Sequence, residues 1–162
     1  MKILSVSIGD YKVSGNRSKI TTFGLGSCVA VIVYDPSAKV GGLAHFVLPD
    51  TNFSPGKYSK RVAKFGRLAV PAMVEEMEKR GAVKGRMWAK IVGGANMFRE
   101  LVRDESKTIG ARNIEIARAV LSELGIPIIA EDVGGHHGRS VDFYLDTGKV
   151  IVKSFQKGEK EI

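Results

Sequence analysis

The residues best suited to chemistry in this chain are Cys28 and His45. Cys28 is the only cysteine among 162 residues, and the glycine-rich turn Gly24-Leu25-Gly26-Ser27 comes directly before it. His45 is the only histidine apart from the adjacent pair His136-His137. A thiol becomes a strong nucleophile when a neighbouring histidine takes its proton, giving a thiolate–imidazolium pair. The two residue types together predict acyl transfer through a covalent cysteine intermediate.

The elements around these two residues predict that they lie close together. Two runs rich in β-branched residues, 29–34 and 40–48, flank the turn segment Asp35–Lys39, which is typical of an antiparallel hairpin. With the loop centred near Ser37, Cys28 faces residues 45–47, and directly opposed side chains lie roughly 5 Å apart at Cβ. We therefore expect His45 beside Cys28 or one diagonal away, although a slip of one residue would turn it to the other face.

Three neighbouring residues complete the candidate site. Thr22 is a candidate to orient His45, because its hydroxyl can accept a hydrogen bond from the ring N–H. The backbone amides of Ser27 and Cys28, which follow Gly26, could point at a developing oxyanion. The alternative is structural, because a lone cysteine in a Val/Ala run is often an inert core residue and a histidine in an apolar strand is often a core residue too. Spacing alone leaves both interpretations open.

Five motifs in order along the chain resemble the CheD family of chemoreceptor glutamine deamidases. They are TFGLGSCVAV from residue 22, GGLAHFVLPD from residue 41, GGANMF from residue 93, IGARN from residue 109, and EDVGG with GRSV between residues 131 and 141.

The resemblance implies a protein that converts particular glutamines of chemoreceptors to glutamates, with release of ammonia, during chemotaxis. It places the family's cysteine, histidine and threonine on Cys28, His45 and Thr22. It also implies a fold similar to the catalytic domains of glutamine-deamidating toxins, and a CheC-type phosphatase as a partner beside the receptor helices. His136-His137 have no counterpart in the pattern, and the stretch from Thr51 to Phe65 is longer than the pattern leads us to expect.

The rest of the chain predicts a single α/β (α+β) domain over residues 1–155, a layered sandwich of mostly antiparallel strands with two main helices. Apolar stripes predict helices over 68–80 and 113–124. Strands are expected over 2–8, 19–23, 86–92 and 126–130, and residues 141–153 read as a further hairpin. The charged residues 156–162 predict a frayed C-terminal tail.

Composition narrows the function further. No apolar run approaches the roughly 20 residues of a membrane helix, and a single cysteine suits a reducing, cytoplasmic compartment. Metal-ligand spacings are missing from the sequence, so neither a metal nor another cofactor is expected. The net charge of +8 favours an acidic partner. A methylesterase acting on glutamate esters at the same site, a non-catalytic docking module and a nucleic-acid binder stay open as alternatives.

Overall fold

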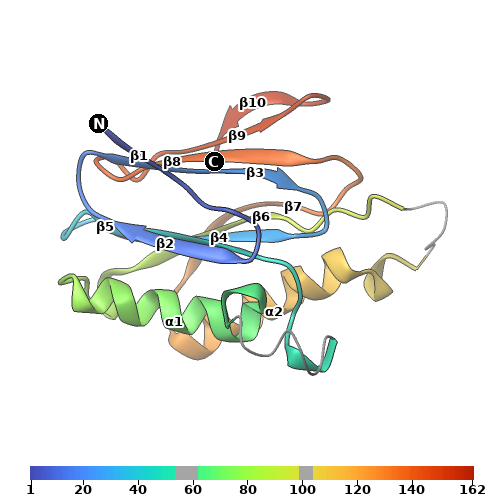
Figure 1. Ribbon diagram of the computed structural model, residues 1–162, viewed down its shortest axis with the longest axis horizontal. Coiled ribbons are helices and arrows are strands. Elements are labelled where there is room, and N and C mark those ends of the chain that lie inside the picture. Colours follow the sequence, from blue (N-terminus) through green and yellow to red (C-terminus); the bar gives the residue numbers. More distant parts are fainter. Residues whose placement is uncertain (54–61, 99–103) are drawn as a thin grey trace.

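The computed structural model describes residues 1–53, 62–98 and 104–162, and in them two five-stranded sheets and two α-helices build three layers (Figure 1). The outer sheet has the order β1-β3-β8-β9-β10 and the central sheet the order β2-β5-β4-β6-β7. Most neighbouring strands are antiparallel, and only β1/β3 and β6/β7 run parallel. The outer sheet consists of β1 (Lys2–Ser5), β3 (Ser18–Leu25), β8 (Arg139–Tyr144), β9 (Val150–Ser154) and β10 (Gly158–Glu161). The central sheet consists of β2 (Asp10–Ser14), β4 (Val29–Asp35), β5 (Val40–Phe46), β6 (Trp88–Gly93) and β7 (Ile128–Val133).

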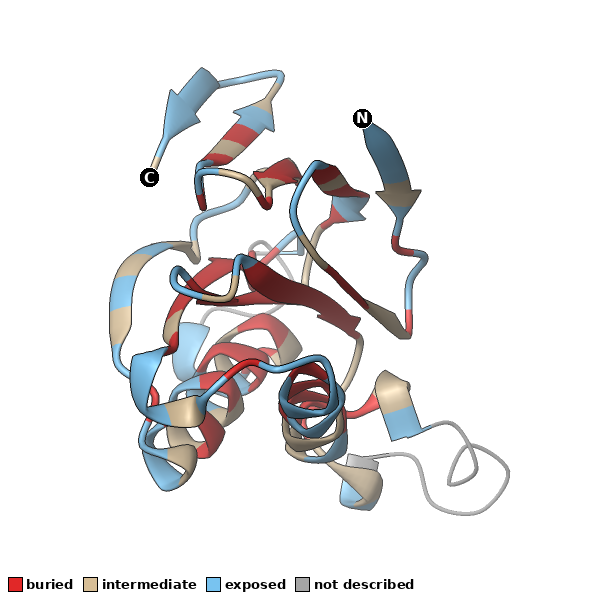
Figure 2. Ribbon diagram, turned by 90° about the vertical axis from the view of Figure 1, so that its left-hand side faces the viewer, coloured by how far each residue is buried: buried red, intermediate tan, exposed pale blue. Residues whose placement is uncertain are grey.

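The central sheet is buried on both faces, because the helices cover one and the outer sheet covers the other (Figure 2). Every residue of β4 and of β5 is buried. Successive side chains of a strand point to opposite faces. Val29, Val31 and Val33 accordingly pack in the core beneath the helices, whereas Ala30 and Ile32 pack between the sheets.

The two helices begin earlier in the chain than their apolar stripes predicted. Helix α1 spans Gly66–Lys79 and α2 spans Ile109–Leu124. Helix α2 begins where the Thr108 hydroxyl accepts a hydrogen bond from the amide of Ala111 at 3.1 Å, an N-cap that satisfies one of the free donors of the first turn. It ends at Gly125, whose φ of 73° is left-handed, as expected for a glycine that terminates a helix.

The expectation of a frayed tail over residues 156–162 is wrong, because Gly158–Glu161 form β10. This strand pairs antiparallel with β9 in the register Gly158↔Ser154 to Glu161↔Ile151. All four of its residues are exposed, so their charged side chains face solvent while the backbone forms the ladder. A charged composition therefore hid an edge strand, and charged side chains on an edge also discourage pairing with another chain.

Candidate active site

Cys28 and His45 both lie on the face of the central sheet that packs against the outer sheet. Cys28 directly precedes β4 and is only 6% exposed. In the hairpin, Ala30 pairs with His45 and Val29 with Phe46. Cys28 and Ala30 share a face because they are two residues apart. The register therefore puts His45 one diagonal from Cys28, as the hairpin pattern predicted.

Thr22 reaches the histidine from the other sheet. Its Oγ1 lies 2.7 Å from Nδ1 of His45 and 2.8 Å from the carbonyl oxygen of Val6. A carbonyl can only accept, so the single hydroxyl hydrogen goes to Val6 and the oxygen must accept from Nδ1–H of His45. This fixes the neutral tautomer of the ring. Nε2 then carries the lone pair, and it is buried and has no hydrogen-bond partner in the described part of the chain.

Burial favours the neutral form of both members of the pair. Desolvation lowers the pKa of His45 to about 4 and raises the pKa of the Cys28 thiol. Both shifts favour the uncharged form, because a charge loses its hydration when it is buried. Burial therefore disfavours the thiolate–imidazolium pair that the sequence predicts. In the described part of the chain no hydrogen bond joins Sγ of Cys28 to Nε2 of His45, so the two atoms must come within hydrogen-bond reach before the proton can pass between them.

The loop that carries the nucleophile, residues 26–28, is held by its carbonyl groups. The oxygen of Gly26 accepts from the amide of Ala95 at 2.9 Å, and that of Cys28 accepts from the amide of Gly94 at 2.8 Å. By contrast, within the residues the structure describes, the N–H groups of Ser27 and Cys28 donate to no other residue, and the Cys28 N–H is directed at its own thiol. Two donors without acceptors beside a nucleophile are what an oxyanion hole requires.

Asn113 is a residue of this site that the sequence analysis missed. It lies on α2, is fully buried, and donates from Nδ2 to the carbonyl of Ser27 at 2.9 Å and to that of Val47 at 2.8 Å. The motif IGARN contains it, but its position at the start of an expected helix carried no sign that it would face the nucleophile loop. Contact with a loop so remote in sequence is a property of packing.

A cavity of ≈ 380 Å³ opens next to the nucleophile loop. Its lining includes Ser27, Val47, Leu48, Met97 and Phe98. The last two are substantially exposed, so an apolar rim borders the approach to the site. Residues 54–61, which belong to the stretch from Thr51 to Phe65 that is longer than the family pattern, lie outside the described residues.

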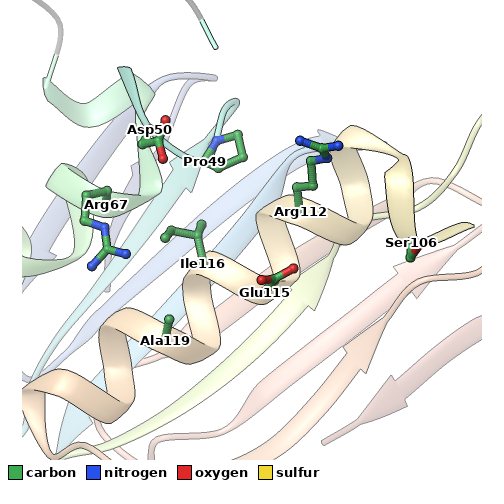
Figure 3. Close-up of a pocket in the computed structure, with 8 residues that line it drawn as sticks. All are labelled: Pro49, Asp50, Arg67, Ser106, Arg112, Glu115, Ile116 and Ala119. Atoms are coloured by element: carbon green, nitrogen blue, oxygen red, sulfur yellow. The ribbon is translucent and has the colours of Figure 1, made fainter. Parts of the chain in front are cut away.

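A second cavity of ≈ 380 Å³ lies between α1 and α2 and is lined by neither Cys28 nor His45 (Figure 3). Arg67 from α1 and Arg112 from α2 both line it, with Asp50 and Glu115. Arg67 forms a two-bond contact with Glu123, at 2.8 and 3.0 Å. The two carboxylates in the lining offset the charges of its two guanidinium groups, so the cavity is neither predominantly positive nor predominantly negative.

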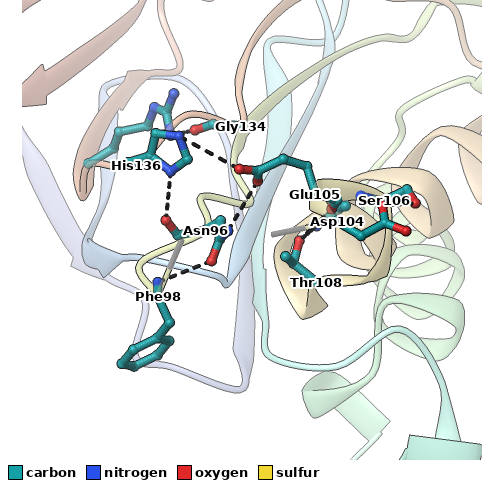
Figure 4. A network of polar contacts seen from close by, with 10 residues as sticks. Asn96, Phe98, Asp104, Glu105, Ser106, Thr108, Gly134 and His136 are labelled. Carbon is teal, nitrogen blue, oxygen red and sulfur yellow. Dashed lines mark hydrogen bonds and ion pairs between the residues drawn. The ribbon is translucent and has the colours of Figure 1, made fainter. Parts of the chain in front are cut away.

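His136 belongs to a polar network beside the site and not to a metal centre (Figure 4). Its Nδ1 donates to the carbonyl of Asn96 at 3.0 Å, and Nε2 lies 3.8 Å from Glu105. The Asn96 side chain donates to the same carboxylate at 3.2 Å. No cluster of three or more metal-ligating side chains occurs in residues 1–53, 62–98 and 104–162.

The acidic pair Glu131-Asp132 forms structural ion pairs. Both residues lie within β7 and not after it. Glu131 binds Arg118 at 2.6 Å, while Asp132 binds Arg139 at 3.3 Å and Lys160 at 3.2 Å. These cations hold the pKa of each carboxyl below its ordinary value, so the pair stays charged and cannot serve as a general acid near neutral pH.

Comparison with known proteins points in the same direction as this geometry. Residues 47–154 match the family model described as CheD chemotactic sensory transduction. The chain is 43% identical over 161 residues to a probable chemoreceptor glutamine deamidase CheD of Caldanaerobacter subterraneus, covering 99% of this chain and 98% of the relative. It is 46% identical over 155 residues to the chemoreceptor glutamine deamidase CheD of Thermotoga maritima, covering 96% and 94%.

Solved structures show a more distant likeness. The Bacillus licheniformis hypothetical protein YfiH aligns with a TM-score of 0.49 at 18% identity, over 81% of this chain and 58% of that one. Within the described residues, no helix has the length and apolar character needed to span a membrane.

Proposed function

The chain belongs to the CheD family and is a chemoreceptor glutamine deamidase of chemotaxis, and from this premise we propose that Cys28, His45 and Thr22 carry out the reaction. The observation that supports this assignment best is the 2.7 Å hydrogen bond between Thr22 and His45. It orients the ring and leaves the basic Nε2 on the same sheet face as the thiol. The reaction is acyl transfer from a side-chain carboxamide to water.

In the first half of the reaction, Sγ of Cys28 attacks the carboxamide carbon of the glutamine while its proton passes to Nε2 of His45. The carbonyl oxygen becomes an oxyanion, which the N–H groups of Ser27 and Cys28 stabilise. Gly26 lets the Met97 side chain approach the nucleophile loop, because an added Cβ would lie 3.3 Å from Cγ of Met97. His45 then returns the proton to the leaving nitrogen, so that ammonia departs and a thioester remains.

In the second half, a water molecule attacks the thioester and gives its proton to Nε2 of His45. The oxyanion forms at the same donors and collapses with loss of the Cys28 sulfur, which recovers the proton from His45. Glutamate is the product. Thr22 takes part only through the ring, because its hydrogen bond stabilises Nδ1–H throughout both halves.

The substrate surface consists of chemoreceptor cytoplasmic helices, and the protein acts in the cytoplasm. The net charge of +8 favours helices rich in acidic residues. Met97, Phe98 and the exposed Phe23 offer apolar contacts near the nucleophile loop. A CheC-type phosphatase is the second partner in this proposal. Its co-purification with equal affinity for wild type and Cys28→Ala would separate docking from chemistry, and a phosphatase that fails to bind either form would remove it as a partner.

The test of the function is mass spectrometry of a purified chemoreceptor cytoplasmic fragment incubated with wild type or with Cys28→Ala. We expect amide-to-acid conversion at particular glutamines with wild type only. Methanol release from a methylated fragment, without conversion of glutamine, would replace the deamidase with the methylesterase. Equal conversion by Cys28→Ala would exclude the proposed nucleophile.

A further inference from the structure

Helix α2 lies unusually close to the loop that follows β6. A Cβ added to Gly110, in the first turn of α2, would come within 2.5 Å of the carbonyl oxygens of both Gly94 and Ala95. Only glycine permits such an approach between a helix and a neighbouring backbone. The same loop holds the carbonyls of Gly26 and Cys28. Because α2 packs so closely on this loop, the second turn of the helix, which contains Asn113, lies against the nucleophile loop.

The side-chain amide of Asn113 joins the two segments that carry the candidate nucleophile and base. One acceptor, the carbonyl of Ser27, directly precedes Cys28, and the other, the carbonyl of Val47, is two residues beyond His45. The bonds are 2.9 and 2.8 Å long, and the Asn113 side chain that donates both of them is fully buried. A single planar group thus links the two segments just beyond Val29↔Phe46, the last pair of the β4–β5 ladder.

The bond to Ser27 also orients an oxyanion donor. In a trans peptide the C=O and the following N–H point in opposite directions, and the described chain contains no cis peptide bond. Holding the Ser27 carbonyl toward α2 therefore turns the Cys28 N–H away from α2. The carbonyl of Gly26 is likewise held toward the amide of Ala95, so the N–H of Ser27 points away from Ala95. Within the described residues, these are the two amides of the loop that donate to no other residue.

We propose that Asn113 is a positioning residue for deamidation, which aims the Cys28 N–H at the oxyanion through the Ser27 carbonyl. The inference rests on the proposed function of Cys28. A role in packing alone does not account for the residue type, because Oδ1 of Asn113 is buried and has no hydrogen-bond partner in the described part of the chain. An apolar side chain would avoid that unsatisfied oxygen, whereas only the amide supplies two donors at this place.

The experiment compares wild type with Asn113→Asp, which has the same shape but no N–H group, and with Asn113→Leu. Deamidation of the receptor fragment gives kcat and KM, and iodoacetamide gives the alkylation rate of the Cys28 thiol. We expect kcat to fall about 10- to 100-fold with KM within about twofold, because the donor acts only in the transition state. Alkylation should stay within about threefold of wild type, since attack on iodoacetamide needs no oxyanion donor.

Val120→Ala is the matched control. Val120 is also buried on α2, at 1% exposure, and is not in contact with the nucleophile loop through any hydrogen bond. We expect a lower melting temperature for this variant with unchanged kcat at a temperature where it is folded.

Wild-type kcat in the folded Asn113 variants would overturn the proposal. So would an equal loss of alkylation and deamidation, an equal loss in Val120→Ala, or failure of both Asn113 variants to fold, because each assigns the residue to the scaffold. A wild-type protein without Cys28-dependent deamidation would overturn the proposed function instead.

Discussion

The hydroxyl of Thr22 and the imidazole of His45 form a 2.7 Å hydrogen bond across the interface of the two sheets. Thr22 is fully buried in β3 of the outer sheet and His45 is 1% exposed in β5 of the central sheet. Because the hydroxyl hydrogen is given to Val6, the bond selects one ring tautomer. The packing of two sheets thus decides which nitrogen of the candidate base is free.

Removing the Thr22 hydroxyl should slow deamidation without unfolding the protein. Thr22→Val keeps the shape but loses the acceptor for Nδ1–H. We expect kcat to fall about tenfold, the equivalent of one neutral hydrogen bond of roughly 1.4 kcal/mol. Thr22→Ser restores a hydroxyl and should recover most of this loss in the same assay. Equal kcat in wild type and Thr22→Val would show that the ring needs no such support.

His45 should make the stability of the protein fall as the pH is lowered below 6.5. The unfolded chain binds the proton with the ordinary pKa of 6.5, whereas burial lowers the pKa of the folded state to about 4. Between pH 6.5 and about pH 4 the unfolded state binds more protons, so lowering the pH favours unfolding. Above pH 6.5 the contribution of His45 to stability no longer changes with pH. The full loss is about 3 kcal/mol, of which about 2 kcal/mol is gone by roughly pH 5.

Urea unfolding at pH 7 and at pH 5 measures this loss. His45→Asn is the control, because it keeps the titration of all other groups while removing that of the ring. The variant should show a pH dependence weaker than that of wild type by the amount given above. Identical pH dependences would mean that the ring titrates alike in the folded and unfolded states.

The Cys28 thiol should react slowly with iodoacetamide at neutral pH. Burial raises its pKa, and the thiolate is the reactive form. We expect the alkylation rate to be still rising above about pH 9, beyond the midpoint of an ordinary thiol near 8.5. A midpoint below 7 would instead show that a thiolate–imidazolium pair exists before substrate binds.

Gly93 should tolerate no side chain. Its φ is 109°, and an added Cβ would lie 2.4 Å from the carbonyl oxygen of Cys28. Gly81 has a similar φ of 98° but no heavy atom within 4 Å of its Cβ position. Gly81→Ala therefore carries only backbone strain, about 1–2 kcal/mol, and should keep full activity.

Gly93→Ala adds displacement of the nucleophile loop to the same strain. We expect a loss of stability above about 3 kcal/mol and loss of deamidation at temperatures where the protein is folded. Thermal unfolding and the receptor-fragment assay on the two variants measure the difference. A Gly93→Ala protein as active as Gly81→Ala would show that the loop can move without consequence.

The sequence by itself determined the local part of the site. The β-branched runs on either side of Asp35–Lys39 set the register of β4 and β5, and that register places His45 one diagonal from Cys28. Hairpin pairing depends on residues close in sequence, so turn chemistry and alternation are sufficient to predict it. The apolar stripes of the two helices have the same local origin.

Only the tertiary structure decided how that pair is supported and charged. The contacts of Thr22 with His45 and of Asn113 with Ser27 join different layers of the fold, and no local pattern records which segments remote in sequence will pack together. The shifts in pKa that favour neutral Cys28 and His45 also depend on burial, which exists only once the layers pack together. The edge strand β10 also depends on tertiary structure. Its charged residues form a strand because they pair with β9, and their composition alone does not predict one.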